Sequence, residues 1–145
     1  MAFQFSLGSV LKVRGIVEER EERLLQKILF EIAQAVEAVE RIDAEIERTD
    51  ESRSSEIFRK MSGHHLHASY EKVNQLKQEK KNVIGQIEKL VQLRDRQFIA
   101  YAGARRDREM LTDMREEKRN VYDIGLARSE QKILDDNYIA RRGRV

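Results

Sequence analysis

An unbroken heptad seam in the first half of the chain constrains the fold more than any other feature. Seven apolar residues follow one another at alternating spacings of three and four, which places them on one face of a helix. They are Leu25, Ile28, Ile32, Ala35, Val39, Ile42 and Ile46. A stripe of this kind needs a partner helix along its whole length, so the pattern predicts a coiled coil.

The apolar residues nearer the N-terminus predict a change of register. They are Leu7, Val10, Val17 and Leu24, with Arg14 and Glu21 in the remaining slots. This stripe joins the main seam at Ile28 through a four-residue step, the spacing of a stutter. We therefore expect the supercoil to be relaxed at this point.

A second seam runs through the second half of the chain. It consists of Val73, Leu76, Val83, Ile87 and Leu90, with Lys80 and Arg94 in two further slots. An adjacent stripe consists of Ile84, Val91, Phe98 and Tyr101. Two overlapping stripes make a wide apolar face, which indicates a helix that contacts more than one neighbour or twists around one.

The periodicity fails between the two halves. Residues 49–55 are polar and rich in turn formers, and Ser62-Gly63 offers a glycine C-cap, so we place the turn within 50–66, near that pair. The sequence therefore predicts an all-α fold, a long antiparallel two-helix coiled-coil hairpin with both termini at one end. The expected organisation is one domain, 1–145, with helix 1 at about 3–60 and helix 2 at about 66–140.

Composition excludes several classes of protein. The 145 residues contain no proline, which would break long helices, and no cysteine for disulfides, thiolate metal sites or a nucleophile. No apolar run approaches the ~18 residues of a membrane span, and the N-terminus lacks the pattern of a secretory signal, so we expect a cytoplasmic protein. The 28 basic and 26 acidic residues nearly cancel, which gives no bulk attraction to nucleic acid or anionic lipid.

The sequence contains no recognisable catalytic motif. It has no nucleophile–base pair, phosphate-binding glycine loop or metal-protease motif, and a two-helix hairpin has no concave pocket for a small molecule. We therefore expect no enzymatic activity, no cofactor and no bound metal. His64, His67 and Glu71 would share one helix face and could present ligands to zinc, but a solvent-exposed turn supplies few supporting groups. Polar turn residues are the preferred interpretation.

Basic residues cluster towards the C-terminus. They are Arg105, Arg106, Arg108, Arg115, Lys118, Arg119, Arg141, Arg142 and Arg144. One hypothesis is a surface for phosphate or an acidic partner, and the other is a solvated face whose cations pair with nearby carboxylates. Few aromatic side chains stand among these residues, which weakens the nucleic-acid hypothesis, and we expect no nucleic-acid partner.

The two ends of the chain carry more distinctive motifs. Residues 3–14 read F-x-F-x-L-x-x-V-L-x-x-R, and residues 128–135 read R-x-E-x-K-x-L-D. Together with the length and the two-helix plan, these motifs resemble the flagellar type III export protein family FliJ. The injectisome stalk proteins of the YscO type are similar, and the middle of the chain would match many coiled coils.

The resemblance implies a non-enzymatic stalk like the central stalk of rotary ATPases. Its implied partners are the hexameric flagellar export ATPase, the cytoplasmic domain of the membrane export gate, and export chaperones, at the cytoplasmic side of the inner membrane. The end with both termini would enter the ATPase ring, and its residues are Phe3, Phe5, Leu7, Leu11, Arg14, Arg128, Lys132 and Asp135. The implied gate contact lies on one helix face towards the turn, at Tyr70, Asn74, Lys77 and Lys81.

Two other functions stay open. The chain could be an unrelated structural coiled coil that self-associates into a four-helix bundle through the wide face of the second half. It could also be a nucleic-acid-binding coiled coil that uses the C-terminal arginines. For Phe3 and Phe5, contact with a partner competes with a purely internal role, in which the two rings staple the hairpin shut.

Overall fold

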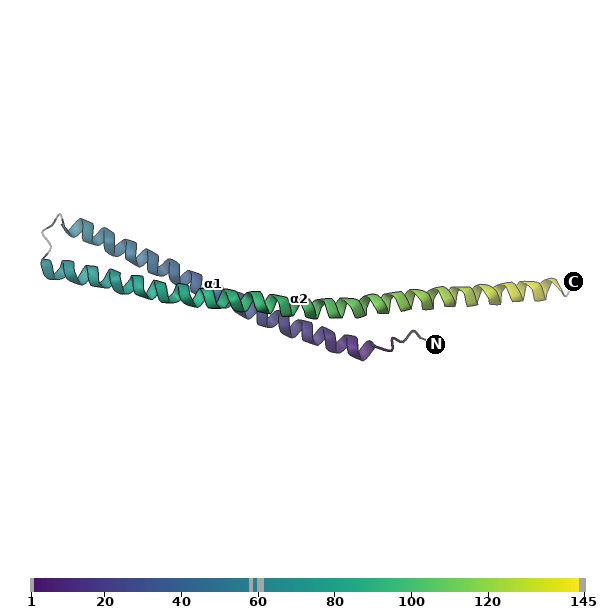
Figure 1. The fold of residues 1–145 in the computed structure, drawn as a ribbon. Coiled ribbons are helices and arrows are strands. Elements are labelled where there is room, and N and C mark those ends of the chain that lie inside the picture. The colour runs from purple at the N-terminus through teal and green to yellow at the C-terminus, as the bar shows by residue number, and fades with distance from the viewer. Residues whose placement is uncertain (1, 58, 60–61, 144–145) are drawn as a thin grey trace. The chain divides into compact units, whose positions relative to one another are not determined.

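The computed structural model consists of two long helices joined by a short connection (Figure 1). Helix α1 spans Gly8–Ile57 and helix α2 spans Gly63–Arg142. The structure describes residues 2–57, 59 and 62–143, and no strand occurs among them. The predicted all-α fold of two helices packed against each other is confirmed.

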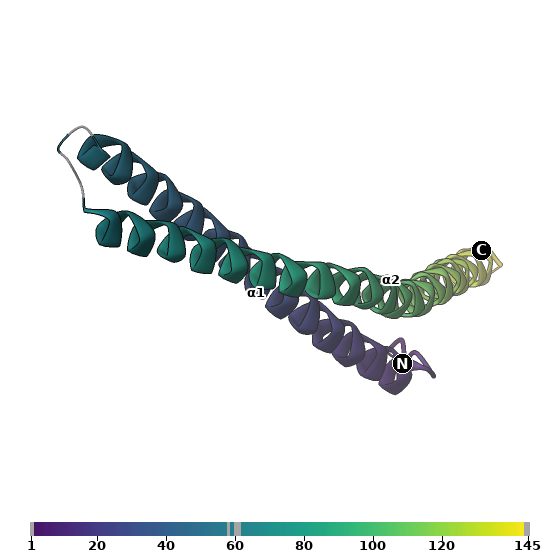
Figure 2. The same ribbon diagram turned by 60° about the vertical axis from the view of Figure 1, so that its left-hand side comes forward.

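The chain divides into two compact units. Glu21–Ala100 forms the first, which we call the hairpin unit because it contains the connection between the helices. Met1–Arg20 and Tyr101–Val145 form the second, which we call the terminal unit. Each unit holds one segment of α1 and one segment of α2 (Figure 2).

The core of the hairpin unit is the contact between the two predicted seams. All seven seam residues of α1 are buried or half-buried, and so are the residues in the predicted seam slots of α2. Leu25, Ile42 and Val73 are the most deeply buried, with 8%, 7% and 5% of their surface exposed. The seams meet because burial of apolar surface is the main gain available to two helices that are otherwise polar.

The second apolar stripe of α2 lies beside the seam. Ile84 and Phe98 are 38% and 58% exposed, while Val91 is half-buried. Each of the three directly follows a seam residue, so its side chain projects from the flank of the helix pair. The wide apolar face expected from the sequence is therefore only partly covered by α1.

Polar contacts line the opposite flank of the hairpin unit. Lys72 Nζ donates to Glu45 Oε1 at 3.0 Å. This hydrogen bond, with the positive charge of Lys72, lowers the pKa of the Glu45 carboxyl. Glu45 and Lys72 each directly precede a seam residue, Ile46 and Val73. Residues that precede these seam positions therefore meet on one flank, and residues such as Ile84, which follow seam positions, meet on the other.

The connection lies within the predicted interval of 50–66, since α1 ends at Ile57 and α2 begins at Gly63. Ser62 is the N-cap of α2: its Oγ accepts from the His65 amide at 3.3 Å, and its carbonyl accepts from the Leu66 amide at 3.1 Å. Gly63, expected as a C-cap of the first helix, is instead the first residue of the second. The expected end of the first helix, at about residue 60, lies outside the described residues.

The predicted change of register near the N-terminus is wrong. Val10 and Leu24 are 41% and 43% exposed, although Leu7 and Val17 are half-buried. The heptad instead continues backwards from Leu25 without a step, through Glu21 and Glu18 to Leu11. Glutamates are tolerated in these seam slots because the carboxylate of each accepts a hydrogen bond from a side chain of α2, Gln97 for Glu21 and Arg108 for Glu18.

Candidate partner-binding site

The residues before α1 fold against α2 in the terminal unit. The rings of Phe3 and Tyr122 lie 5.6 Å apart at an interplanar angle of 49°. Lys118 Nζ lies 5.7 Å from the centre of the Phe5 ring. The Gly8 amide donates to the Phe5 carbonyl at 3.0 Å, which turns the chain into the helix. Phe3 and Phe5 are half-buried, so they staple the pair of helices together and still leave surface for a partner.

A shallow hollow of about 290 Å³ lies at this staple. It is lined by Phe3, Phe5, Gly8, Leu11 and Arg115. Aromatic and aliphatic walls beside a guanidinium can accommodate an apolar side chain next to a carboxylate. This hollow is therefore a candidate contact point for a protein partner.

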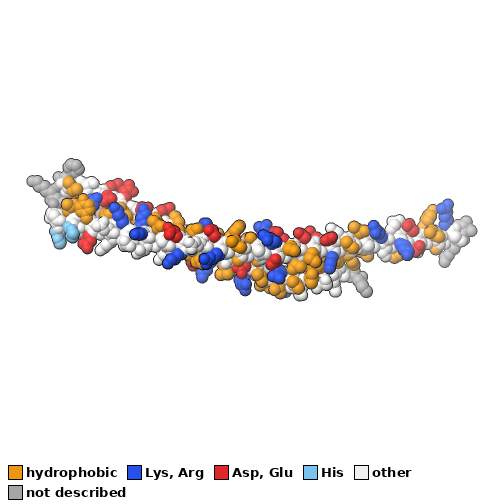
Figure 3. Space-filling model, in the orientation of Figure 1, with side chains coloured by type: hydrophobic (Ala, Val, Ile, Leu, Met, Phe, Trp, Pro, Cys, Tyr) orange, Lys and Arg blue, Asp and Glu red, His pale blue; other side chains and the backbone are white. Residues whose placement is uncertain are grey.

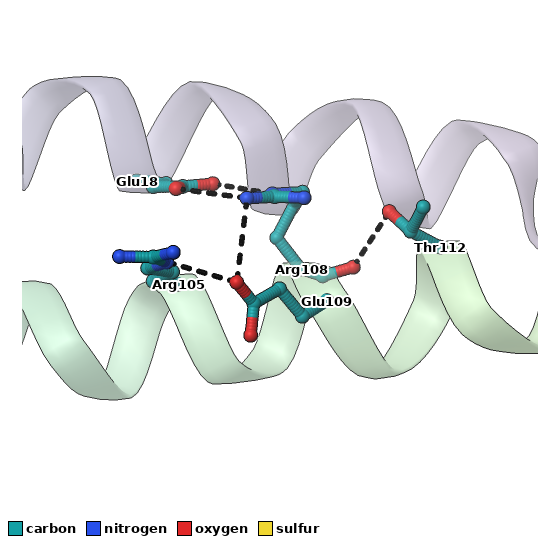
Figure 4. A network of polar contacts seen from close by, with 5 residues as sticks. All are labelled: Glu18, Arg105, Arg108, Glu109 and Thr112. Carbon is teal, nitrogen blue, oxygen red and sulfur yellow. Dashed lines mark hydrogen bonds and ion pairs between the residues drawn. The ribbon is translucent and has the colours of Figure 1, made fainter.

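A polar network joins α1 to α2 within the terminal unit (Figure 4). Arg108 donates to Glu18 through Nε at 2.6 Å and through an Nη at 3.2 Å, a bidentate pair. The Glu18 side chain is only 14% exposed. Glu109 accepts from Arg105 Nε at 2.8 Å, and Thr112 Oγ1 donates to the Arg108 carbonyl at 3.0 Å.

The network shifts the titration of its members. The hydrogen bonds from Arg108, with its charge, lower the pKa of the Glu18 carboxyl. The same contact raises the pKa of Arg108, and the bond to Glu109 raises the pKa of Arg105. Each of these shifts favours the charged form of its group. A charged pair in the seam favours one register over its neighbours, since a slip would leave Glu18 unpaired.

The five N-terminal residues of the predicted ATPase-binding set lie together in the terminal unit. Leu7 and Leu11 are half-buried like the two phenylalanines. Arg14 forms an ion pair with Asp107 at 3.5 Å, with both side chains about half exposed. These residues contact the stretch of α2 that ends at Tyr122, so they form one continuous surface with it.

Packing of the residues before α1 on α2 reaches Tyr122, whose ring lies 5.6 Å from that of Phe3. The next seam positions hold Gly125, Ser129, Lys132 and Asp136, which offer no apolar side chain to a partner. Every residue from 123 to 143 is exposed. Helix α2 nevertheless continues to Arg142, about 30 Å further at 1.5 Å per residue. We call residues 123–142 the C-terminal extension.

The three C-terminal members of the predicted set lie in this extension. Arg128 lies six residues beyond Tyr122 and Asp135 thirteen, about 9 Å and 20 Å along the helix. The structure therefore does not bring Arg128, Lys132 and Asp135 together with Phe3 and Phe5. Both termini belong to the terminal unit, as expected, but α2 extends well beyond the residues that pack against the start of α1. Asp135 accepts from Gln131 at 3.1 Å.

Large apolar side chains are exposed along the C-terminal extension. They are Ile124, Leu126, Ile133, Leu134, Tyr138 and Ile139, each between 48% and 66% exposed. Figure 3 shows apolar side chains of α2 standing among charged ones near its C-terminal end. A helix with apolar side chains uncovered on several sides is typical of a segment that is buried in a complex.

The predicted gate-binding residues lie on α2 in the hairpin unit. Tyr70, Asn74, Lys77 and Lys81 are all exposed, at spacings of four, three and four. The guanidinium of Arg53 lies 4.1 Å from the centre of the Tyr70 ring, and Arg53 also pairs with Asp50 at 2.8 Å. Tyr70 therefore supports the packing of the hairpin while half of its surface remains exposed.

The remaining candidate residues make ordinary surface contacts. His64 and His65 lie at the start of α2 with ring centres 6.5 Å apart, and no group of three possible metal ligands occurs among the described residues. In the arginine cluster, Arg105 and Arg108 pair with carboxylates, and Arg142 lies 6.0 Å from the Tyr138 ring. Arg144 lies outside the described residues.

Sequence reasoning missed the polar layers of the seam. Besides Glu18 with Arg108, the Gln97 side-chain amide donates to the Glu21 carbonyl at 3.0 Å and to its carboxylate. The signal was available, because an unbroken heptad counted back from Leu25 passes through Glu21 and Glu18. The apolar residues Val17 and Leu24, each one position before Glu18 and Leu25, indicated a different register for this part of the seam.

Comparisons with protein-family models, with curated proteins and with solved structures find no match to this chain. In the part of the chain that the structure describes, neither helix carries an apolar stretch long enough to cross a bilayer.

Proposed function

We propose that the chain is a non-enzymatic stalk of the flagellar type III export apparatus. In this role it promotes assembly of the hexameric export ATPase and couples the ATPase to the export gate and to export chaperones. It would act in the cytoplasm, at the inner face of the inner membrane. The proposal rests on the motifs at residues 3–14 and 128–135, which resemble the FliJ family.

The observation that carries the proposal is the C-terminal extension. It is a single helix with exposed apolar side chains, and it contains the second motif in full. One helix, about 10–12 Å across with its side chains, is slim enough to enter the central opening of a ring. Burial of Leu134, Tyr138 and Ile139 inside a ring would recover apolar surface that the free protein leaves in water.

Arg128 and Lys132 supply the charged part of the proposed ATPase contact. They lie at i and i+4, on one side of the extension, and both are exposed. The staple residues Phe3 and Phe5, with the hollow beside Arg115, form a second contact at the base of the extension. The gate contact would use Tyr70, Asn74, Lys77 and Lys81 of the hairpin unit.

The test is a charge reversal in the extension. Arg128→Glu with Lys132→Glu should leave thermal unfolding unchanged, because neither side chain is buried. It should abolish stimulation of the export ATPase, since the contact with the ring would change from attraction to repulsion. A matched control is Lys89→Glu with Arg96→Glu, which makes the same charge change on an exposed face of the hairpin unit.

Full stimulation by the extension variant would remove the ATPase contact from this site. Equal loss of stimulation in both variants would show that net charge, and not position, controls binding. A variant that unfolds at lower temperature would show that Arg128 and Lys132 have a structural role instead.

A further inference from the structure

One flank of the terminal unit carries apolar side chains that neither helix covers. Val10 of α1 and Met114 and Val121 of α2 each directly precede a seam position. Residues that precede seam positions meet on one flank of the pair, as Glu45 and Lys72 do in the hairpin unit. One turn away on the same side, each helix adds a further apolar residue. All five are between 39% and 67% exposed, and we call them the methionine patch: Val10, Val13, Met110, Met114 and Val121.

The two helices bring the patch residues to the same level. Arg14 of α1 pairs with Asp107 of α2 at 3.5 Å. Because the helices are antiparallel, Val10, one turn before Arg14 on α1, lies level with the next turn of α2, between Met110 and Met114. The patch is therefore one surface built by both helices.

The patch is hollowed on α2. A shallow hollow of about 320 Å³ lies between Met114 and Val121, and Glu117 and Lys118 also line it. Lys118 Nζ lies 5.7 Å from the centre of the Phe5 ring, so this cation already has a contact within the protein. The hollow therefore offers an apolar floor and a carboxylate to a partner.

Two carboxylates border the middle of the patch. Asp113 and Glu117 are exposed at i and i+4 on α2, and no basic residue stands three or four positions from either. Neither forms an ion pair among the described residues. Arg106 borders the end of the patch, about 10 Å from Asp113 along the helix. Like charges at i and i+4 repel one another, so a cation from outside the chain would relieve the pair.

We propose that the methionine patch binds an amphipathic helix of a different protein, whose apolar stripe is bordered by lysine or arginine. Two packed helices leave a groove along their flank that a third helix fits, and methionine adapts to the shape of a partner. The bordering cations would meet Asp113 and Glu117. A second copy of the chain would bring the same two carboxylates to the interface, and an anionic lipid surface would repel them.

The size of the patch indicates a transient contact. From Met110 to Val121 it is about 16 Å long, and two helices side by side measure about 20 Å. A partner would then bury roughly 600 Å² in total, about half of what a stable complex needs. We expect a dissociation constant on the order of tens of micromolar. The proposal does not rest on the proposed function, and it uses none of the residues of the ATPase and gate contacts.

The test measures binding of two designed helical peptides of about 18 residues to the full chain by calorimetry. Both peptides carry leucine at heptad positions a and d, with lysine at e and g in one and glutamate in the other. We expect the lysine peptide to bind roughly tenfold more tightly. Asp113→Lys with Glu117→Lys should reverse this preference, because the border of the patch changes sign. A matched control is Asp123→Lys with Glu130→Lys, the same charge change in the C-terminal extension, which should leave the preference unchanged.

The apolar part of the patch is tested separately. Val13→Ser with Met110→Ser should weaken binding of the lysine peptide roughly tenfold, because both side chains would be covered by the peptide. Ile99→Ser, at an exposed position of the hairpin unit, should not change it. Circular dichroism of each variant confirms that the helices are intact.

Three results would overturn the proposal. One is a lysine peptide that does not bind at about 500 µM. Another is a preference that reverses with Asp123→Lys and Glu130→Lys, since that result places the peptide on the extension. The third is dimerisation of the chain alone that Val13→Ser with Met110→Ser abolishes, because the patch would then belong to a second copy.

Discussion

The clearest prediction compares the same substitution at a buried and at an exposed isoleucine of the hairpin unit. Ile42 is 7% exposed and lies in the seam, whereas Ile99 is 72% exposed on the outer face of α2. Replacement by alanine removes three carbon atoms from each side chain, a transfer free energy of about 2.4 kcal/mol for a fully buried residue. Alanine also gains about 0.4 kcal/mol in helix propensity at both positions.

These numbers predict different losses of stability. Ile42→Ala should lower the free energy of unfolding by about 2 kcal/mol, and Ile99→Ala by about 0.3 kcal/mol. We expect little additional cavity cost at Ile42, because a two-helix coil would leave a notch open to water and not a sealed void. The predicted loss of unfolding free energy for Ile42→Ala therefore lies at the low end for an isoleucine-to-alanine change in a protein core.

Urea unfolding followed by circular dichroism at 222 nm measures both losses. With a slope of about 2 kcal/mol/M, Ile42→Ala should shift the midpoint by about 1 M, and Ile99→Ala by less than about 0.2 M. Equal shifts for the two variants would refute the assigned seam, because the two isoleucines would then be equally buried.

Three further predictions follow from the terminal unit and the turn. Because Arg108 lowers the pKa of Glu18, the pair stabilises the fold above the unfolded pKa of about 4.3, and this contribution is lost as pH falls through the lower folded value. The difference in unfolding free energy between wild type and Glu18→Gln should therefore shrink between pH 6 and pH 3, and a constant difference would contradict the assignment. Removal of residues 123–145 should leave the unfolding midpoint unchanged, because none of the described residues there is buried. It should reduce helical ellipticity by up to about 15%, which is the share of the extension in the two helices. A lower midpoint would mean that the extension packs on the rest of the protein. Finally, the joint substitution His64→Ala with His67→Ala should not change zinc affinity, measured by calorimetry, and a stoichiometric zinc lost in that variant would contradict this expectation.

Much of the hairpin could be predicted from the sequence because its driving force is periodic. A seam such as Leu25, Ile28 and Ile32 indicates a helix and also the face that it buries, since spacings of three and four fit only that geometry. The connection was predictable to within 50–66 because apolar periodicity must fail where the chain reverses. The cap was assigned to the wrong helix, since a Ser-Gly pair can either end one helix or begin the next.

The register near the N-terminus required the tertiary structure. Apolar count alone favours Val10, Val17 and Leu24, but the free energy of a seam also depends on what a polar residue finds opposite. Glu18 can occupy a seam slot only because Arg108, ninety residues away in the chain, presents a guanidinium at 2.6 Å. Such a pairing cannot be read from the spacing within one helix.

The offset between the chain ends was likewise decided by the fold. The sequence by itself determined two helices, their seams and the distinctive motifs at residues 3–14 and 128–135. Only the packing of Phe3 on Tyr122 determined how far along α2 the N-terminal segment reaches, and the second motif begins six residues beyond that point, at Arg128. The physical reason is that helix length depends on local propensity, whereas the end of a coiled coil depends on where both partners still offer apolar surface.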